Sequence, residues 1–241
     1  MARGFGCRKE VLKQLRDLYD RTVKDKYNKN YLDALKNFNA IAENYLRPVL
    51  SNYYSLERSM NQAWKTCKGS LYEFAVINTL KQIIENNEIL RNKLDVILGD
   101  DVSYEHTSQI VIKNWCDILP DVDMVLVERD ANKVKAILSC KTSLRERLTE
   151  TAFWKRELEK SGNSDVKVIF ITTDKDNELR TETNRYILLH VVDYTFITDP
   201  VKYRELVNTY RKKYGHRSDF NKLIEKIKLI DDIENIMLEL I

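Results

Sequence analysis

The sequence predicts an α/β fold in which a central mixed β-sheet is flanked by helices and preceded by a helical N-terminal region. Two observations lead to this prediction. Apolar residues recur at helical spacing through the N-terminal third of the chain, whereas short apolar runs rich in β-branched residues become frequent only after Pro120. Further helices are predicted between and after these runs, and this order of elements is typical of a sheet covered by helices.

The N-terminal third is expected to form helices. The segments from Leu12 to Tyr19 and from Leu32 to Tyr45 carry apolar residues at helical spacing. Pro48 interrupts the pattern before a further helical stretch over 55–64. Gly69 is expected to begin a separate long helix with one apolar side.

The sheet is expected to begin after a break at Gly99-Asp100-Asp101, with a short strand over 108–112. The apolar runs 124–127 and 134–138 flank Arg129-Asp130-Ala131-Asn132-Lys133, which is typical of a hairpin turn. The remaining predicted elements are a helix over 144–160, strands over 166–172 and 186–197, and helices over 201–213 and 219–239. The last helix is amphipathic and is expected to pack on the core or on a second subunit.

The hairpin brings candidate functional side chains to one face. Folding about Ala131 places Asp123 opposite Ser139 and Asp121 opposite Lys141, and residues two apart on a strand share a face. Carboxylates at the start of one strand and a lysine at the end of the next would then lie within reach of one metal ion. The alternative is an ordinary exposed hairpin whose acids are solvated and whose lysine protects a sheet edge.

These side chains suit Mg²⁺-dependent hydrolysis of a phosphodiester. One or two carboxylates hold the ion and leave positions for water and phosphate. Asp123 is our first choice for the principal ligand, because an apolar run follows it at the strand entrance, and Asp121 is the second choice. Lys141 would orient or deprotonate the water and offset the charge of the phosphate.

Pro120-Asp121-Val122-Asp123 followed by Ser139-Cys140-Lys141 resembles the signature of the PD-(D/E)xK nuclease superfamily. The segment from Pro120 to about Glu159 looks like a type II restriction endonuclease. In the members that read CCGG or interrupted CC–GG sites, an Arg-(Asp/Glu)-Arg element just after the catalytic lysine reads G·C pairs. Arg145-Glu146-Arg147 matches that element, and its spacing from Lys141 is similar to the interrupted-site branch.

The resemblance implies a role in DNA recognition for the segment after Lys141. Arg145 and Arg147 would each contact guanine O6 and N7, and Glu146 would accept a hydrogen bond from cytosine N4. Thr142 and Ser143 are expected to cap the following helix and to contact a phosphate. The alternative is a solvated helical turn in which Glu146 pairs with neighbouring arginines.

Two positions depart from the family pattern. The acid expected two residues before the lysine is Ser139, and Trp154 stands where the resembling branch carries a second acid on the following helix. A second metal ligand is therefore expected elsewhere. Glu73 ranks first because family members often place an upstream helical glutamate beside the metal, followed by Glu150 and Glu157. For each of the three, the alternative is a solvated charge on a helix.

The charge balance permits sequence-specific DNA binding without demanding it. The net charge is +3, so no strongly basic tail implies general affinity for nucleic acid. A local basic stripe would suffice, and Arg145, Arg147, Lys155 and Arg156 are its candidates. Neither GxxxxGK[ST] nor GxGxxG is present, so no nucleotide cofactor is expected.

The four cysteines are widely spaced and form no CxxC pair, which argues against a zinc site and against a disulfide framework. Cys140 alternates to the face opposite Lys141 and is expected in the core. No apolar stretch is long enough to span a bilayer, and the N-terminus lacks the apolar region of a signal peptide. We therefore expect a cytoplasmic protein with no membrane partner.

These observations predict a helical region over 1–66 that binds DNA, supports dimerisation or both, and a PD-(D/E)xK-like catalytic domain over 67–241. The expected activity is Mg²⁺-dependent cleavage of double-stranded DNA at a short, palindromic, G·C-containing site. A homodimer is expected because two-fold symmetry supplies one active site to each strand. The alternatives are a repair or junction-resolving nuclease of the same fold and a catalytically inactive DNA-binding module, which Ser139 would suit.

Overall fold

The computed structural model describes residues 7–113, 115, 117–144 and 147–241. The chain divides into two compact units, one that ends at Thr79 and one that runs from Leu80 to Ile241. A single long helix, α4 (Glu57–Asn86), contributes residues to both units.

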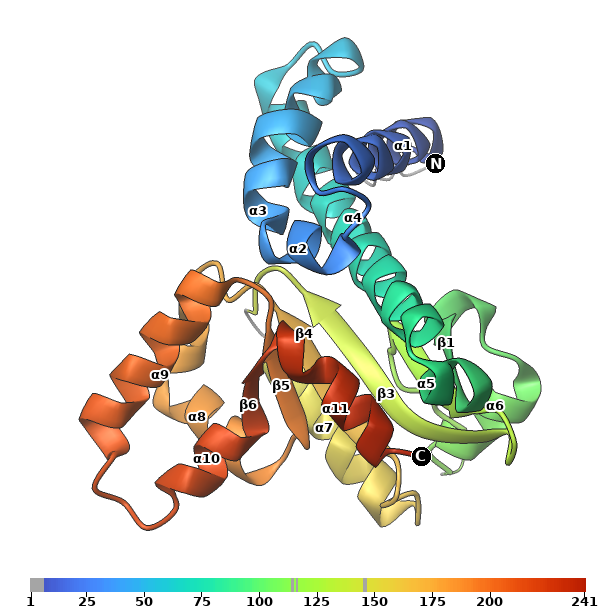
Figure 1. Cartoon of the computed structure of the whole chain (residues 1–241), viewed down its shortest axis with the longest axis vertical. Helices are drawn as coiled ribbons and strands as arrows, with labels where there is room; N and C mark the ends of the chain where they lie inside the picture. Colours follow the sequence, from blue (N-terminus) through green and yellow to red (C-terminus); the bar gives the residue numbers. More distant parts are fainter. Residues whose placement is uncertain (1–6, 114, 116, 145–146) are drawn as a thin grey trace. The chain divides into compact units, whose positions relative to one another are not determined.

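The first unit is helical throughout the elements that the structure describes. It comprises α1 (Lys9–Lys26), α2 (Tyr31–Lys36), α3 (Phe38–Ile41), a π-helical turn (Ala42–Leu46), a 3₁₀ segment (Arg47–Asn52) and the first part of α4 (Figure 1). Aromatic rings dominate its core. Tyr19, Phe38 and Tyr72 are buried, and the rings of Phe38 and Tyr72 meet edge to face with their centroids 5.0 Å apart.

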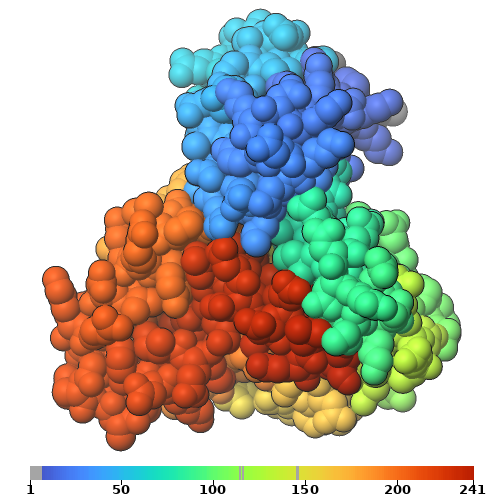
Figure 2. Space-filling view, viewed as in Figure 1, coloured from blue at the N-terminus to red at the C-terminus, as the bar shows by residue number. Residues whose placement is uncertain are grey.

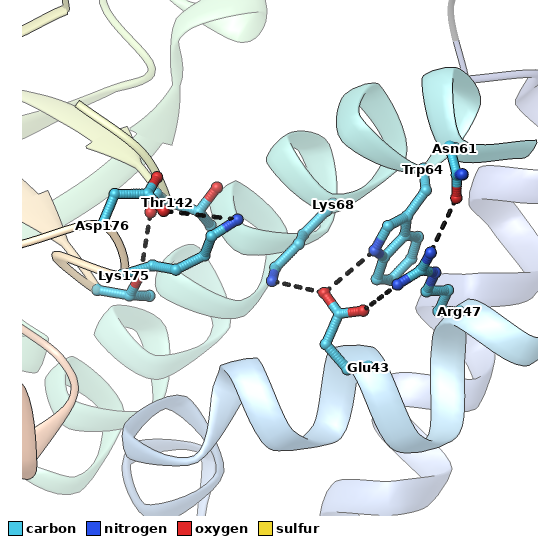
Figure 3. A network of polar contacts seen from close by, with 9 residues as sticks. Glu43, Arg47, Asn61, Trp64, Lys68, Thr142, Lys175 and Asp176 are labelled. Carbon is cyan, nitrogen blue, oxygen red and sulfur yellow. Dashed lines mark hydrogen bonds and ion pairs between the residues drawn. The ribbon is translucent and has the colours of Figure 1, made fainter. Parts of the chain in front are cut away.

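A polar network centred on Glu43 also holds α4 within this unit (Figure 3). Glu43 Oε1 accepts hydrogen bonds from Lys68 Nζ at 2.9 Å and from Trp64 Nε1 at 3.2 Å. Its Oε2 accepts from Arg47, which also donates to Asn61 Oδ1 at 2.8 Å. Burial acts to raise the pKa of Glu43, but the hydrogen bonds from Lys68, Trp64 and Arg47 lower it overall. The network therefore keeps Glu43 charged, so that it can pair with the buried Lys68.

Two predictions for this unit are wrong. Helix α4 runs continuously through Gly69, because one glycine costs a helix only about 1 kcal/mol and buried neighbours such as Cys67 and Leu71 hold the turn in place. Cys7 and Cys67 form a disulfide with their Cα atoms 4.9 Å apart. They are 60 residues apart in the sequence, so only the packing of α1 near α4 brings them together.

The second unit contains a mixed six-stranded sheet in the order β1-β2-β3-β4-β5-β6, as predicted for the fold class. β1 to β3 pair antiparallel, and β3 to β6 pair parallel. The strands are β1 (Leu94–Leu98), β2 (Met124–Glu128), β3 (Lys133–Lys141), β4 (Lys167–Thr172), β5 (Tyr194–Ile197) and β6 (Ile227–Leu229). The helices are α5 (Glu88–Lys93), α6 (Tyr104–Ile110), α7 (Arg147–Lys160), α8 (Glu182–His190), α9 (Pro200–Tyr214), α10 (Phe220–Lys226) and α11 (Ile233–Glu239).

Helices cover both faces of this sheet, which is why strand residues are buried on either side. Met124 and its three successors in β2 are all buried, as expected for a strand with two covered faces. Figure 1 shows α11 crossing one face, with α7 behind the other. The C-terminal segment borders α5 in the space-filling view (Figure 2), and Asn87 before α5 donates to Glu234 of α11 at 2.8 Å.

Several predicted elements of this unit have a different structure. The segment 108–112 was predicted as a strand, but its first part belongs to α6, which Ser103 caps. The first part of 186–197 belongs to α8, which Thr181 caps. β6 divides the predicted helix 219–239 into α10 and α11, and β1 was not predicted. Short apolar runs fit both a strand and a buried helix, so the capping residues decide between them.

Candidate active site

Asp123 and Lys141 meet where β2 begins and β3 ends. Lys141 Nζ lies 2.8 Å from Asp123 Oδ1, and the backbone N–H of Cys140 donates to Asp123 Oδ2 at 2.6 Å. The Asp123 side chain is only 10% exposed, so these contacts replace much of its hydration. Both carboxylate oxygens are therefore fixed in direction before any ligand binds.

The hairpin register agrees with the prediction at this end of the strands. Met124 pairs with Leu138, and the N–H of Asp123 donates to the Leu138 carbonyl at 3.1 Å. A register shift between Leu126 and Val127 lies nearer the turn. The shift therefore leaves the functional end of the hairpin in the predicted alignment. Cys140 is buried, as predicted from its place beside Lys141.

Gly99 fixes the backbone on the other side of Asp123. Its N–H donates to the Asp123 carbonyl at 2.9 Å. A Cβ at Gly99 would lie 2.0 Å from the carbonyl oxygen of Val122, so only glycine fits here. From the sequence, Gly99 was interpreted only as a break between elements, because its close contact with Val122 is a tertiary feature.

Asp121 and Glu150 lie on either side of Arg147. Arg147 Nη1 is 3.0 Å from Glu150 Oε2 and 3.7 Å from Asp121 Oδ2. The ladder between β2 and β3 ends at Met124 and Leu138, and the ion pair found for Asp121 is with Arg147. These two candidate metal ligands are therefore neighbours, bridged by a candidate recognition residue.

The other residues considered for the second ligand lie on three different elements. Glu73 lies on α4 within the first unit and is half-buried. Glu157 on α7 is 2.5 Å from Lys160, one turn along the same helix. Trp154 packs against the core of the second unit, and Ser139 is half-buried in β3 beside Phe170 of β4. Within the second unit, Glu150 is the candidate acid that shares an ion-pair partner, Arg147, with Asp121 among the described residues.

The segment after β3 is anchored to the connection that follows β4. Thr173 Oγ1 donates to the Thr142 carbonyl at 3.1 Å, and the Leu144 N–H donates to Glu178 Oε2 at 2.8 Å. Arg145 and Glu146, predicted to read bases, lie outside the described residues. The structure describes α7 from Arg147, and the two residues before it lie outside the described residues, so the capping role of Thr142 and Ser143 stays a prediction.

Lys155 does not belong to an exposed basic stripe. It is 4% exposed, lies 2.8 Å from Asp193 Oδ2 and donates to the Val166 carbonyl. Arg156 is exposed and pairs with Glu159 at 3.3 Å. The prediction for Lys155 is wrong because a lysine at helical spacing looks the same in the sequence whether its partner is water or a buried carboxylate.

The oxygen donors of the site are of the type that Mg²⁺ prefers. Asp121, Asp123 and Glu150 each lie within ion-pair distance of a basic side chain. Among the described residues, no three His, Cys, Asp or Glu side chains converge into a metal site by themselves. Waters and DNA phosphate would therefore complete the coordination of an ion held here.

Comparison with known proteins identifies the family. Residues 80–223 match the model of the family described as BsaWI restriction endonuclease type 2, and this match covers most of the second unit. The chain belongs to this family. The matched region contains Asp123, Lys141 and the segment between β3 and α7.

Two curated relatives agree with this assignment. The chain is similar to the "Putative type II restriction enzyme MjaVIP" of Methanocaldococcus jannaschii, with 31% identity over 57% of the chain and 63% of the relative. It is also similar to the "Probable type II restriction enzyme HpyAORF263P" of Helicobacter pylori, with 36% identity over 45% of the chain and 54% of the relative. The matches thus span less than two thirds of either relative.

The fold itself has a solved counterpart. The chain is similar to the restriction endonuclease in a structure titled "Restriction endonuclease PspGI-substrate DNA complex", with a TM-score of 0.61. The likeness covers 96% of this chain and 92% of the other, at 15% sequence identity, and so concerns the fold. Within the described residues, no helix is both long and apolar enough to cross a bilayer.

Proposed function

We propose that this protein is a type II restriction endonuclease that hydrolyses double-stranded DNA with Mg²⁺ at a short, palindromic, G·C-containing site. The observation that carries the proposal is the contact between Asp123 and Lys141 at the functional end of the β2–β3 hairpin. It places an acid and a base side by side within a chain that belongs to a restriction endonuclease family.

Asp123 is the principal carboxylate of the proposed site. The Cys140 N–H and Lys141 hold its two oxygens, so the carboxylate is pre-organised rather than free to rotate. Bound Mg²⁺ would supply Lewis-acid stabilisation of the phosphate charge. Lys141 would orient or deprotonate the attacking water and offset the charge of the transition state.

A second carboxylate is needed because Ser139 is a neutral hydroxyl. The position of Glu150 beside Arg147 and Asp121 supports Glu150 for this role. Glu73, on α4, is the alternative carried by the family resemblance. Asp123 is the first Mg²⁺ ligand whether Glu150 or Glu73 is the second.

Recognition of the site is assigned to the segment from Thr142 to Arg147. In our proposal Arg145 and Arg147 bind guanines, Glu146 binds cytosine, and Thr142 and Ser143 contact phosphates. The helical region over 1–66 would contact DNA, support a homodimer or both. Two-fold symmetry would then match a palindromic site. The proposed location of the enzyme is the cytoplasm.

Digestion of phage DNA of known sequence tests the activity. The whole chain is incubated with Mg²⁺ beside Lys141→Ala and Lys135→Ala variants. Lys135 is a matched control, because it lies on the same strand and pairs with Glu128 of β2 at 3.2 Å, far from Asp123 along the hairpin. We expect discrete fragments from the wild type and from Lys135→Ala, and none from Lys141→Ala.

Other results of this digestion would contradict the proposal. Mg²⁺-dependent nicking that follows DNA structure rather than sequence would favour a repair or junction-resolving nuclease. Tight binding to one sequence without any cleavage would favour a catalytically inactive DNA-binding module. Discrete fragments produced by Lys141→Ala would show that Lys141 is not required for cleavage.

A further inference from the structure

We propose that Glu178 is a positioning residue for DNA recognition, because its carboxylate fixes the backbone from which Arg147 projects. The inference rests on the proposed role of the 142–147 segment in reading bases. Glu178 lies in the connection between β4 and α8, far from the recognition segment in the sequence.

Two consecutive hydrogen bonds connect Glu178 to Arg147. Glu178 Oε2 accepts from the Leu144 N–H at 2.8 Å, and the Leu144 carbonyl accepts from the Arg147 N–H at 2.6 Å. Leu144 is thus held through both of its peptide groups. Since Arg147 is the first described residue of α7, Leu144 fixes the backbone where the described part of this helix begins.

The anchor at Leu144 is partly shielded from water. Leu144 is 1% exposed and belongs to the same core cluster as Leu148 of α7. An amide that loses its hydration in such a place is unfavourable unless it finds a partner, and a carboxylate is a strong acceptor. The apolar side chain and the charged hydrogen bond therefore hold the same residue from two sides.

Glu178 is itself held by a well-ordered turn. Asp174 Oδ1 accepts from the Leu179 N–H at 3.3 Å, and the Glu178 carbonyl accepts from Asn184 Nδ2 at 2.7 Å. Asn177, directly before Glu178, has a φ of 56° and receives a hydrogen bond from Lys202 Nζ at 3.1 Å. The turn therefore presents the Glu178 carboxylate from a fixed backbone.

The consequence for recognition is geometric. A guanidinium discriminates guanine through two hydrogen bonds of fixed direction, and each good pair contributes about tenfold or more to the discrimination. A small shift of the helix start misaligns both bonds while phosphate contacts, which tolerate a shift, remain. Loss of the Glu178 anchor should therefore reduce sequence discrimination more than it reduces affinity for DNA.

Two variants separate position from charge. Glu178→Asp keeps the charge but withdraws the acceptor by one methylene, whereas Glu178→Gln keeps an acceptor oxygen at the same reach. Glu128→Ala is the control, because it removes another hydrogen-bonded carboxylate at the far end of the hairpin. Each whole chain is assayed with the cleaved sequence found by digestion and with duplexes that carry one substituted base pair.

The readouts are single-turnover cleavage rates and, without Mg²⁺, binding of labelled duplexes by fluorescence anisotropy. We expect Glu178→Asp to lower the ratio of cognate to substituted duplex by about tenfold or more in both readouts. Glu178→Gln and Glu128→Ala should stay within about threefold of the wild type, and all variants should melt as folded proteins.

A wild-type ratio in Glu178→Asp, or an equal loss in Glu178→Gln, would overturn the positioning role. Failure of the wild type to discriminate any sequence would instead overturn the proposed function. The two failures are distinguishable, because only the second involves the unmodified chain.

Discussion

A Cβ on Gly99 would lie 2.0 Å from the carbonyl oxygen of Val122, a separation that no real side chain tolerates. The backbone of Gly99 is therefore pressed against the residue that precedes Asp123. Because the Gly99 N–H also donates to the Asp123 carbonyl, a glycine outside the hairpin fixes the backbone of Asp123, the proposed principal metal ligand.

The first prediction concerns this glycine. Gly99→Ala should displace the backbone at Asp123 and lower the DNA cleavage rate by at least about tenfold, since a misplacement near 1 Å has effects of this size. Gly69→Ala is the control, because nothing lies within 4 Å of a Cβ at that helical position. It should retain activity and raise stability by about 0.5–1 kcal/mol. Equal activity in both variants would contradict the role of Gly99.

The second prediction concerns the second metal ligand. Glu150→Gln should weaken Mg²⁺ binding by about tenfold in isothermal titration calorimetry, because one carboxylate next to Asp121 is lost. Glu157→Gln should leave the affinity unchanged, since Glu157 pairs with Lys160. Glu73→Gln is measured alongside these variants. A loss of affinity in Glu73→Gln, with none in Glu150→Gln, would transfer the role to α4.

The third prediction concerns the pH dependence of stability. Burial raises the pKa of Asp174 to about 6, and one of its oxygens has no hydrogen-bond partner among the described residues. A carboxyl with a raised pKa binds protons more tightly in the folded state, so its contribution to the free energy of unfolding falls as pH rises from about 4 to 6. The loss is roughly 3 kcal/mol at most for this change in pKa.

Urea denaturation at pH 4.5 and pH 7 measures this effect. Asp174→Asn should gain stability relative to the wild type as the pH rises, because the variant has no charge to bury. Asp176→Asn, at an exposed acid of the same connection, should follow the wild type at both pH values. If the wild type instead gains relative to Asp174→Asn towards neutral pH, the charged form of Asp174 is stabilising and the interpretation fails.

The fourth prediction concerns the disulfide of the first unit. The bond between Cys7 and Cys67 closes a loop of 60 residues, for which the chain-entropy model gives a stabilisation of about 4 kcal/mol. Reduction should therefore lower the melting temperature of the oxidised protein. A Cys7→Ser/Cys67→Ser double variant should melt at the lower temperature with or without reductant. A reductant effect that persists in the double variant would assign it to another thiol.

Local features of the site were predictable from the sequence. The turn around Ala131 and the alternation of apolar residues were enough to place Asp123 and Lys141 on one face of the hairpin, because a hairpin is defined by neighbours in the chain. The predicted partner of Lys141 was Asp121, whereas Lys141 contacts Asp123 in the structure. The family resemblance added the endonuclease fold, which the mixed sheet confirms. The mixed pairing around β3 can be predicted from the order of strands and helices alone, because a hairpin makes one neighbour antiparallel and a helical connection makes the other parallel.

Features that depend on distant segments were not predictable. The contact of Gly99 with Val122, the bond from Leu144 to Glu178 and the burial of Lys155 against Asp193 each join segments that are far apart in the sequence. No periodicity within one element reports such a partner. The disulfide was not predicted for the same reason, since the spacing of its cysteines gives no signal and they meet only in the folded unit.

The mixed sheet limits which substitutions and length changes the related sequences can accept. Because β2 runs antiparallel to β3, the start of β2 lies at the same edge as the ends of β3 and β4, and connections from separate parts of the sequence gather there. The bond between Leu144 and Glu178 ties two of these connections together. Substitutions or length changes in 142–147 should therefore be accompanied by compensating changes near position 178 among related sequences, while the strands between them vary independently.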